Sequence, residues 1–265
     1  MISPGSEITA NARNLIRAMR FFGSPRKGGD VQDLPGVSLV SCGLNYAAFN
    51  AALLSEPPGS DPNFRQVIQT AADHFRSRNL RWTCWFCDDF LDPALLRQAR
   101  PLFRAFGLSH LTEPVGMLAD QLLPPRRRLP KLETRPVDNQ PTRLAFAHIT
   151  SVAFEIPHQV CLDIYGSADA WAGDFQGFVG YVDDLPVTSA ATVTAHNVVG
   201  VYSVGTLPHC RKRGYAEAAV RQALALQQEQ TGITATVLQS TYSGLRLYQQ
   251  MGYRKVTNFS VFISS

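Results

Sequence analysis

A run of three cations, Arg211–Arg213, lies directly before Gly214 in the stretch VYSVGTLPHCRKRGYAEAAV, residues 201–220. The apolar residues ahead of the run are typical of a strand, and the apolar spacing after it predicts a helix that begins at Tyr215. The first turn of a helix carries unpaired N–H groups and a partial positive charge, and glycine leaves room for an anion to approach. The stretch therefore predicts a phosphate-binding loop.

This loop differs from the common nucleotide-binding motifs, because the chain contains neither GxxxxGK[ST] nor GxGxxG. A formal net charge of +4 over 265 residues is too small to indicate a nucleic-acid-binding face. A second cationic run, Arg126–Arg128 in LLPPRRRLPK, lies among prolines, which favours a solvated linker over the alternative of a nucleic-acid patch. The expected ligand of the 211–216 loop is therefore a pyrophosphate carrier of another kind.

The second half of the chain predicts a strand, two helices, an antiparallel three-stranded meander and then the order β-α-β-α-β. Asp-Asp-Leu-Pro and His-Asn supply the turns of the meander. The expected elements are a strand at 132–137, helices around 145–154 and 158–165, strands in FQGFVGYVD, TSAATVTA and NVVGVYSVG, a helix from 215, a strand in ITATVLQS, a short helix after Ser243 and a last strand in YRKVTNFSVFI.

The end of the first half resembles the end of the second. FRAFGLSHLTEPVGM, residues 103–117, aligns without gaps with YQQMGYRKVTNFSVF, residues 248–262, and places Gly107 opposite Gly252. The elements expected before the first segment, a helix at 64–79, a strand at 81–87 and a helix at 93–106, repeat the order of the second half. A duplication is slightly favoured over a chance likeness of two helix-Gly-strand units.

Two domains are therefore expected, and the Pro- and Arg-rich segment marks their boundary. The predicted division is an N-terminal domain at 1–123, a linker at 124–131 and a catalytic domain at 132–265.

The residues from Arg211 to Ala216 match the R-x-x-G-x-G/A signature of the coenzyme A loop in the GNAT superfamily of N-acetyltransferases. The Thr-Leu-Pro before the loop and TYSGLRLYQQMGY after the next strand also resemble that family, over about residues 131–265. The resemblance implies an α/β (α+β) fold with two GNAT-like domains, each a mixed, mostly antiparallel central sheet flanked by helices. The first half lacks the signature and has Phe103 in place of Tyr248, so it resembles a degenerate copy without cofactor binding.

The resemblance implies direct transfer of an acetyl group from acetyl-CoA to a primary amine in a ternary complex. The strand before the loop would hold the pantetheine arm, and a backbone N–H near Val204 would stabilise the oxyanion. Tyr248 matches the family's general acid, although a core aromatic is the alternative for it. The implied cofactor-binding residues are Val204, Gly205, Thr206, Arg211, Lys212, Arg213, Gly214, Tyr215, Ala216, Ser240 and Ser243.

The general base is not assigned, because GVYSVGT carries no carboxylate where many relatives have a glutamate. A non-catalytic acyl-CoA-binding regulator or sensor is therefore the alternative to an enzyme. The sequence leaves the acceptor amine and a homodimer open. No nucleic-acid or membrane partner is expected.

Five cysteines in a chain of this length argue against a secreted disulfide framework. Cys84 and Cys87 form a CxxC, but the surrounding RWTCWFC is typical of a buried strand, so core thiols are expected there and no metal. The N-terminus lacks a charged start followed by an apolar secretion core, and no apolar run approaches the roughly 20 residues of a membrane span. A cytoplasmic protein is expected.

Overall fold

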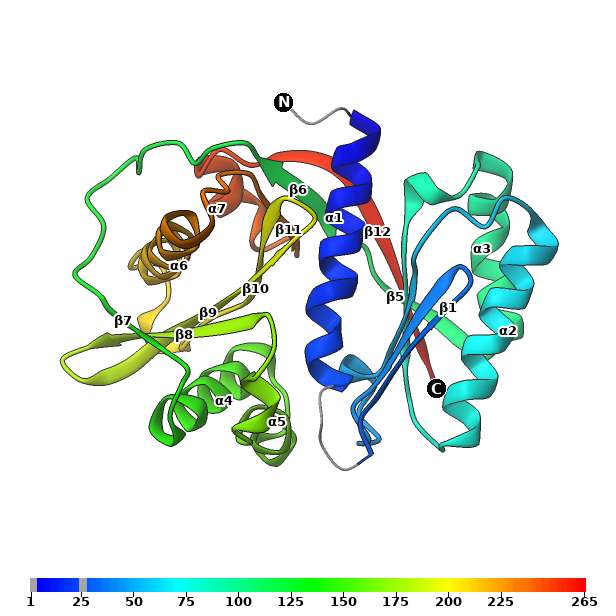
Figure 1. Ribbon diagram of the computed structural model, residues 1–265, viewed down its shortest axis with the longest axis horizontal. Coiled ribbons are helices and arrows are strands. Elements are labelled where there is room, and N and C mark those ends of the chain that lie inside the picture. The colour runs from blue at the N-terminus through cyan, green and yellow to red at the C-terminus, as the bar shows by residue number, and fades with distance from the viewer. Residues whose placement is uncertain (1–3, 24–27) are drawn as a thin grey trace. The chain divides into compact units, whose positions relative to one another are not determined.

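The computed structural model describes residues 4–23 and 28–265, which form two compact units (Figure 1). The N-terminal unit extends to Met117 and includes Gln239–Ser243 and Lys255–Ser265. The C-terminal unit consists of Leu118–Leu238 and Gly244–Arg254. The last segment of the chain therefore belongs to the unit built mainly from the first half, and the domain boundary at 124–131 stays a prediction.

The sheet of the N-terminal unit has the order β1-β2-β3-β4-β12, and β5 also pairs with β12. All of these pairs are antiparallel except β3 with β4, which run parallel. A further strand, β6 (Val115–Ala119), crosses the division between the units. The strands of the sheet are β1 (Asp30–Leu34), β2 (Val37–Ser41), β3 (Ala51–Leu54), β4 (Thr83–Cys87), β5 (Leu108–Thr112) and β12 (Arg254–Ser264).

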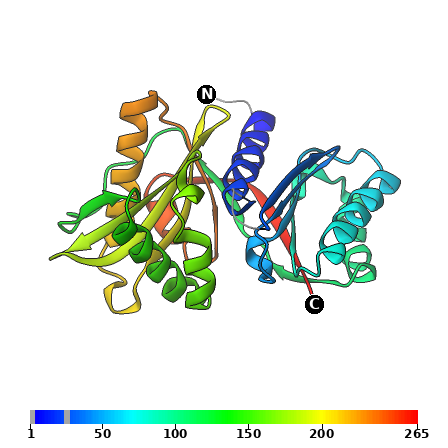
Figure 2. The same ribbon diagram turned by 60° about the horizontal axis from the view of Figure 1, so that its bottom comes forward.

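Helix α1 (Pro4–Met19) covers one face of this sheet, and α2 (Asp61–Ser77) and α3 (Pro93–Ala105) cover the other (Figures 1 and 2). Both predicted helices of this region are confirmed, with α2 starting three residues earlier than expected. The core under α2 and α3 is aromatic: the ring of Phe103 stacks on Phe262 at 4.2 Å and on Phe86 at 5.6 Å. Short 3₁₀ turns at Arg20–Gly23, Ala47–Phe49 and Asp88–Phe90 connect these elements.

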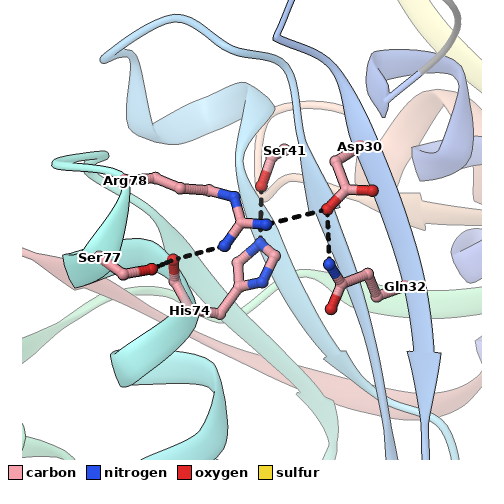
Figure 3. Close-up of polar contacts among 6 residues, drawn as sticks. All are labelled: Asp30, Gln32, Ser41, His74, Ser77 and Arg78. Atoms are coloured by element: carbon pink, nitrogen blue, oxygen red, sulfur yellow. Dashed lines mark hydrogen bonds and ion pairs between the residues drawn. The ribbon is translucent and has the colours of Figure 1, made fainter.

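A polar cluster joins α2 to β1 and β2 in the N-terminal unit (Figure 3). The buried Ser41 hydroxyl and Nε2 of His74 are 2.9 Å apart. Arg78 donates to the His74 carbonyl at 3.2 Å and pairs with Asp30 at 3.3 Å, and Gln32 donates to the same carboxylate at 2.7 Å. Burial lowers the pKa of His74, which favours the neutral imidazole in the folded chain.

The sheet of the C-terminal unit has the order β7-β8-β9-β10-β11. The meander is confirmed, since β8, β9 and β10 pair antiparallel. Its two tight turns contain Asp183-Asp184 and His196-Asn197, and all four residues have positive φ. The strands are β7 (Glu133–Pro136), β8 (Phe175–Val182), β9 (Leu185–Ala195), β10 (Val198–Thr206) and β11 (Thr236–Ser240).

Helices α4 (Gln140–Phe154) and α5 (His158–Tyr165) cover one face of this sheet, and α6 (Tyr215–Thr231) covers the other (Figures 1 and 2). Helix α7 (Leu245–Gln250) follows β11, and 3₁₀ turns lie at Asp169–Trp171 and Pro208–Cys210. Helix α4 starts five residues before the expected position. Its start is a capping box, in which the side chains of Asn139 and Thr142 each accept the other's backbone N–H.

Candidate cofactor site

Strand β10 has a β-bulge at Ser203 and Val204. Its pairing with β9 is regular to Tyr202 opposite Ala191 and resumes at Gly205 opposite Ser189, so two residues of β10 lie opposite one of β9. The φ of Ser203 is 48°, a left-handed conformation that is uncommon for a residue with a side chain. A bulge of this kind turns backbone groups out of the regular hydrogen-bonding ladder.

Two buried hydroxyls of β9 fix the bulge. The Ser189 hydroxyl donates to the Ser203 carbonyl at 2.9 Å, and the Thr188 hydroxyl donates to the Gly205 carbonyl at 2.7 Å. Both side chains are fully buried. Sequence reasoning missed them, although polar residues at buried positions of a central strand are the signal that could have found them.

The same strand separates early from its other neighbour. Within the described residues, the parallel pairing of β10 with β11 covers only Val199 opposite Thr236 and Gly200 opposite Val237. The three residues expected to hold a pantetheine arm, Val204–Thr206, lie beyond this pairing. Their edge of β10 can therefore accept an extended ligand as an added strand.

The loop after β10 leads into α6 without a side-chain cap. Lys212 has φ 63° and Gly214 has φ 92°, and Gly214 is the N-cap residue of the helix. Glycine has no side chain to accept a hydrogen bond from the first turn, so the N–H groups of Tyr215 and Ala216 receive no cap of the kind that serine or aspartate provides. This arrangement suits an anion at the helix N-terminus.

The three cations of the loop have different environments. Arg211 donates to the carbonyl of Thr206 at 3.1 Å and to that of Ala153 at 3.5 Å, so its guanidinium ties the loop to β10 and α4. Lys212 and Arg213 are exposed, and neither has a polar partner among the described residues. The latter two are therefore the loop cations available to a ligand.

Tyr248 lies on α7, with only 9% of its surface exposed. Its ring contacts that of Tyr253 edge to face at 5.7 Å. Burial raises the pKa of Tyr248, so the phenol keeps its proton at neutral pH. Both the expected general acid and its alternative, a core aromatic, are compatible with this position.

The bulged strand, the loop and α6 occur in the order that a GNAT coenzyme A site requires, and a family comparison agrees. Residues 130–253 match the model of the Acetyltransferase (GNAT) family. The chain contains a GNAT domain. The predicted family resemblance is confirmed, and with it a relation to proteins that transfer acyl groups from coenzyme A.

Solved structures similar to the whole chain confirm the predicted fold of two GNAT-like units. A GCN5-related N-acetyltransferase from Kribbella flavida has a TM-score of 0.68 at 18% identity, over 96% of this chain and 95% of its own. A GCN5-related N-acetyltransferase from Sphaerobacter thermophilus has a TM-score of 0.57 at 16% identity, and the match covers 99% of this chain and 93% of that protein. A tandem GNAT protein from the clavulanic acid biosynthesis pathway has a TM-score of 0.53 at 9% identity, and the match covers 97% of this chain and 94% of that protein. No curated protein matches the chain.

Ser240 and Ser243 lie at the end of β11 and in the turn after it, in a segment that belongs to the N-terminal unit. Ser240 is buried and its hydroxyl donates to the Thr241 carbonyl at 2.8 Å. Ser243 is exposed and its hydroxyl bonds to that of Thr241 at 3.0 Å. Their contact with a cofactor stays a prediction, as do the roles of the other site residues.

The N-terminal unit lacks the features of the GNAT coenzyme A loop at the helix that follows β3. The Ser60 side chain caps α2 by accepting the Asn63 N–H, and Asp61 places a negative charge in the first turn. Both α2 and α6 have an acidic residue in the first turn, and each pairs with an arginine four residues later, so the difference between the two helix starts is the cap. A side-chain cap occupies an N–H group that a bound anion would use. This supports the interpretation of the first half as a degenerate copy.

The CxxC residues are core thiols, as the sequence predicts. Cys84 and Cys87 are free and buried on β4, and burial raises the pKa of Cys87 to about 11. Over residues 4–23 and 28–265, no group of three or more His, Cys, Asp or Glu side chains is arranged to hold a metal ion. No helix in the same ranges is long and apolar enough to cross a membrane.

Proposed function

We propose that this protein is an acetyl-CoA-dependent N-acetyltransferase whose C-terminal unit transfers an acetyl group directly to a primary amine in a ternary complex. The observation that carries the proposal is the bulge at Ser203 and Val204 in β10. At this position β10 no longer pairs with β11, and the strand leads through the loop to the uncapped start of α6. One continuous segment then offers backbone groups to each part of an acyl-CoA.

Val204 has the central role in the acyl transfer. When the amine attacks the thioester carbonyl, the carbonyl oxygen becomes an oxyanion, and the Val204 N–H donates to it. The Ser189 hydroxyl holds the Ser203 carbonyl, which shares a planar peptide unit with the Val204 N–H, and the Thr188 hydroxyl holds the Gly205 carbonyl. These two hydrogen bonds would restrain the direction of the N–H before substrate binds. A preorganised donor of this kind costs no reorganisation in the transition state.

The 211–216 loop would hold the pyrophosphate of the donor. The N–H groups of Tyr215 and Ala216 and the cations of Lys212 and Arg213 are the groups that remain available for it. Single helix-end charge interactions contribute only about 0.3 to 1 kcal/mol when exposed, so several amides and cations must act together. Arg211 acts indirectly, by tying the loop to the end of β10.

Tyr248 would protonate the departing thiolate of coenzyme A. A general acid must hold its proton until the leaving group develops charge, and the burial of Tyr248 ensures this over the neutral range. The acceptor amine must lose a proton before it attacks, because a lysine-type amine has a pKa near 10.4. Since β10 carries no carboxylate, that proton leaves through a group that we do not assign.

The missing carboxylate also favours a second candidate, an acyl-CoA-binding regulator without turnover. Release of free coenzyme A thiol from acetyl-CoA on addition of a panel of primary amines separates the two, because only the enzyme accelerates it. Acceleration that disappears in Tyr248→Phe would support the enzyme. Tight acetyl-CoA binding without release under any amine would support the regulator.

Donor binding itself is tested by thermal unfolding with acetyl-CoA. At about 100 times its Kd, a ligand that binds only the folded state adds about 2.7 kcal/mol of stability. The stabilisation should appear in the wild type and be absent in the double variant Arg213→Glu, Gly214→Asp, which places two carboxylates in the loop. A wild type that acetyl-CoA does not stabilise would overturn the proposal.

A further inference from the structure

The linker between the two predicted domains contacts the phosphate loop at Gly214. A Cβ at position 214 would lie 3.2 Å from Nη2 of Arg127 and 3.1 Å from Cδ of Pro130. The glycine of the coenzyme A signature is therefore in close contact with a guanidinium from a distant part of the chain. All of these residues belong to the C-terminal unit.

The chain is also held on the N-terminal side of Arg127, where Leu123 contacts the end of α7. The Leu123 N–H donates to the Met251 carbonyl at 2.9 Å, and Leu123 packs so closely on Gly252 that a Cβ there would lie 2.9 Å from its Cγ. Arg127 thus lies in a short segment anchored to the end of α7 by Leu123 and to the start of α6 by Pro130. Anchoring at both ends limits how far its guanidinium can move from the loop.

Arg127 has no counter-charge among the described residues. It is exposed, and it has no hydrogen bond or ion pair within the part of the chain that the structure describes. Lys212 and Arg213, on the same loop as Gly214, likewise have no partner over residues 4–23 and 28–265. The carboxylate in the first turn of α6, Glu217, is buried and already paired with Arg221 at 2.9 Å. Cations gathered at this uncapped helix start repel one another, and an anion bound among them removes that repulsion.

We propose that Arg127 is a phosphate-binding residue of the donor site, and that its guanidinium contacts the pyrophosphate of coenzyme A beside the first turn of α6. The inference rests on the proposed donor site and adds to it a residue that lies outside the GNAT signature. Arginine is well suited to phosphate binding because its planar guanidinium can donate hydrogen bonds to two phosphate oxygens at once. Arg126 and Arg128 carry the same charge, but neither is among the atoms nearest to Gly214.

The two neighbouring arginines provide matched controls. Arg126→Gln, Arg127→Gln and Arg128→Gln each remove one positive charge from the same exposed linker, so their long-range electrostatic effects are alike. Isothermal titration with coenzyme A should show a Kd about 10-fold higher in Arg127→Gln, equivalent to about 1.4 kcal/mol. The two controls should change the Kd by less than about 2-fold. Unchanged thermal unfolding of the free variants would verify that all three fold.

A second ligand identifies which phosphate is contacted. Dephospho-CoA keeps the pyrophosphate but lacks the 3′-phosphate, so the ratio of Kd values between Arg127→Gln and wild type should be the same for both ligands. A ratio that falls to one with dephospho-CoA would assign Arg127 to the 3′-phosphate and overturn the inference.

The remaining outcomes separate this inference from the proposed function. If the wild type binds coenzyme A and Arg127→Gln binds it equally well or more tightly, the inference is wrong and the donor site stands. Equal losses in all three variants would also overturn it, because a general charge effect would then explain the result. If the wild type does not bind coenzyme A, the proposed function fails and the inference fails with it.

Discussion

Helix α6 has a left-handed glycine at each end, and the pair offers a controlled test of the donor site. Gly214 (φ 92°) precedes the helix, and Gly232 (φ 73°) ends it with an N–H bond to the Gln228 carbonyl at 2.8 Å. An L-residue in this conformation costs about 1 to 2 kcal/mol, so Gly214→Ala and Gly232→Ala should both be destabilised by that amount. For a protein of this size, each kcal/mol lowers the melting temperature by about 2 to 4 °C.

The two variants should differ in ligand binding. A Cβ at Gly232 has nothing within 4 Å, whereas a Cβ at Gly214 lies 3.1 Å from Pro130 and 3.2 Å from Arg127. The methyl group at 214 must therefore push Pro130 and the Arg127 guanidinium aside by a few tenths of an ångström, next to the helix start where the proposal places the phosphates. We expect Gly214→Ala to raise the Kd for coenzyme A about 10-fold or more, equivalent to at least about 1.4 kcal/mol, and Gly232→Ala to leave it unchanged.

Thermal unfolding gives the stability of the two variants, and isothermal titration at a temperature where both are folded gives their affinity. Equal loss of affinity in the two variants would mean that strain in α6 alone affects binding. Unchanged affinity in Gly214→Ala would mean that the phosphates do not lie at this helix start. Either result would refute the reasoning.

Three further predictions concern the catalytic acid, the bulge and the polar cluster. Tyr248→Phe should lower kcat by about 10² to 10⁴ and leave the Kd for acetyl-CoA nearly unchanged; a large change in Kd would instead indicate a packing role. Ser189→Ala removes the donor to the Ser203 carbonyl and should cost about 1 kcal/mol of unfolding free energy, measured in urea, together with a lower kcat; unchanged kcat would contradict the role of the bulge. His74 has a lowered pKa, so the unfolded chain binds its proton more readily, and stability is present above about pH 6.5 and lost as pH falls below it. The urea midpoint of the wild type should therefore fall on acidification more than that of His74→Gln, and parallel pH curves would exclude this contribution.

The sequence predicted much of the C-terminal unit because its signals are local. Hairpin turns at Asp183-Asp184 and His196-Asn197 separate strands of regular composition, and α6 has a clear apolar spacing that stops at Gly232. The start of α4 was predicted too late because the signal was in the cap. Asn139 and Thr142 form the capping box that starts the helix, whereas the apolar spacing typical of a helix begins only several residues later.

The bulge and the linker contact depend on residues that are distant in the sequence. Ser203 has a positive φ, and the Ser189 hydroxyl on the neighbouring strand stabilises this conformation by donating to the Ser203 carbonyl. A serine in the sequence does not by itself indicate a positive φ. Arg127 is 87 residues before Gly214, and a cationic run among prolines is typical of a solvated connection. The grouping of Lys255–Ser265 with the N-terminal unit likewise follows from pairing of β12 with β4 and β5.

The central claim is that β10 and the start of α6 bind the donor, and amide chemical shifts measured during a titration with acetyl-CoA test it most directly. We expect the largest shift changes at the backbone N–H groups of Val204–Thr206 and Gly214–Ala216, with smaller changes at the start of α2. The same titration of Arg213→Glu, Gly214→Asp should leave the Val204–Thr206 signals unmoved. Shift changes that avoid both segments, or no changes at saturating acetyl-CoA, would contradict the account.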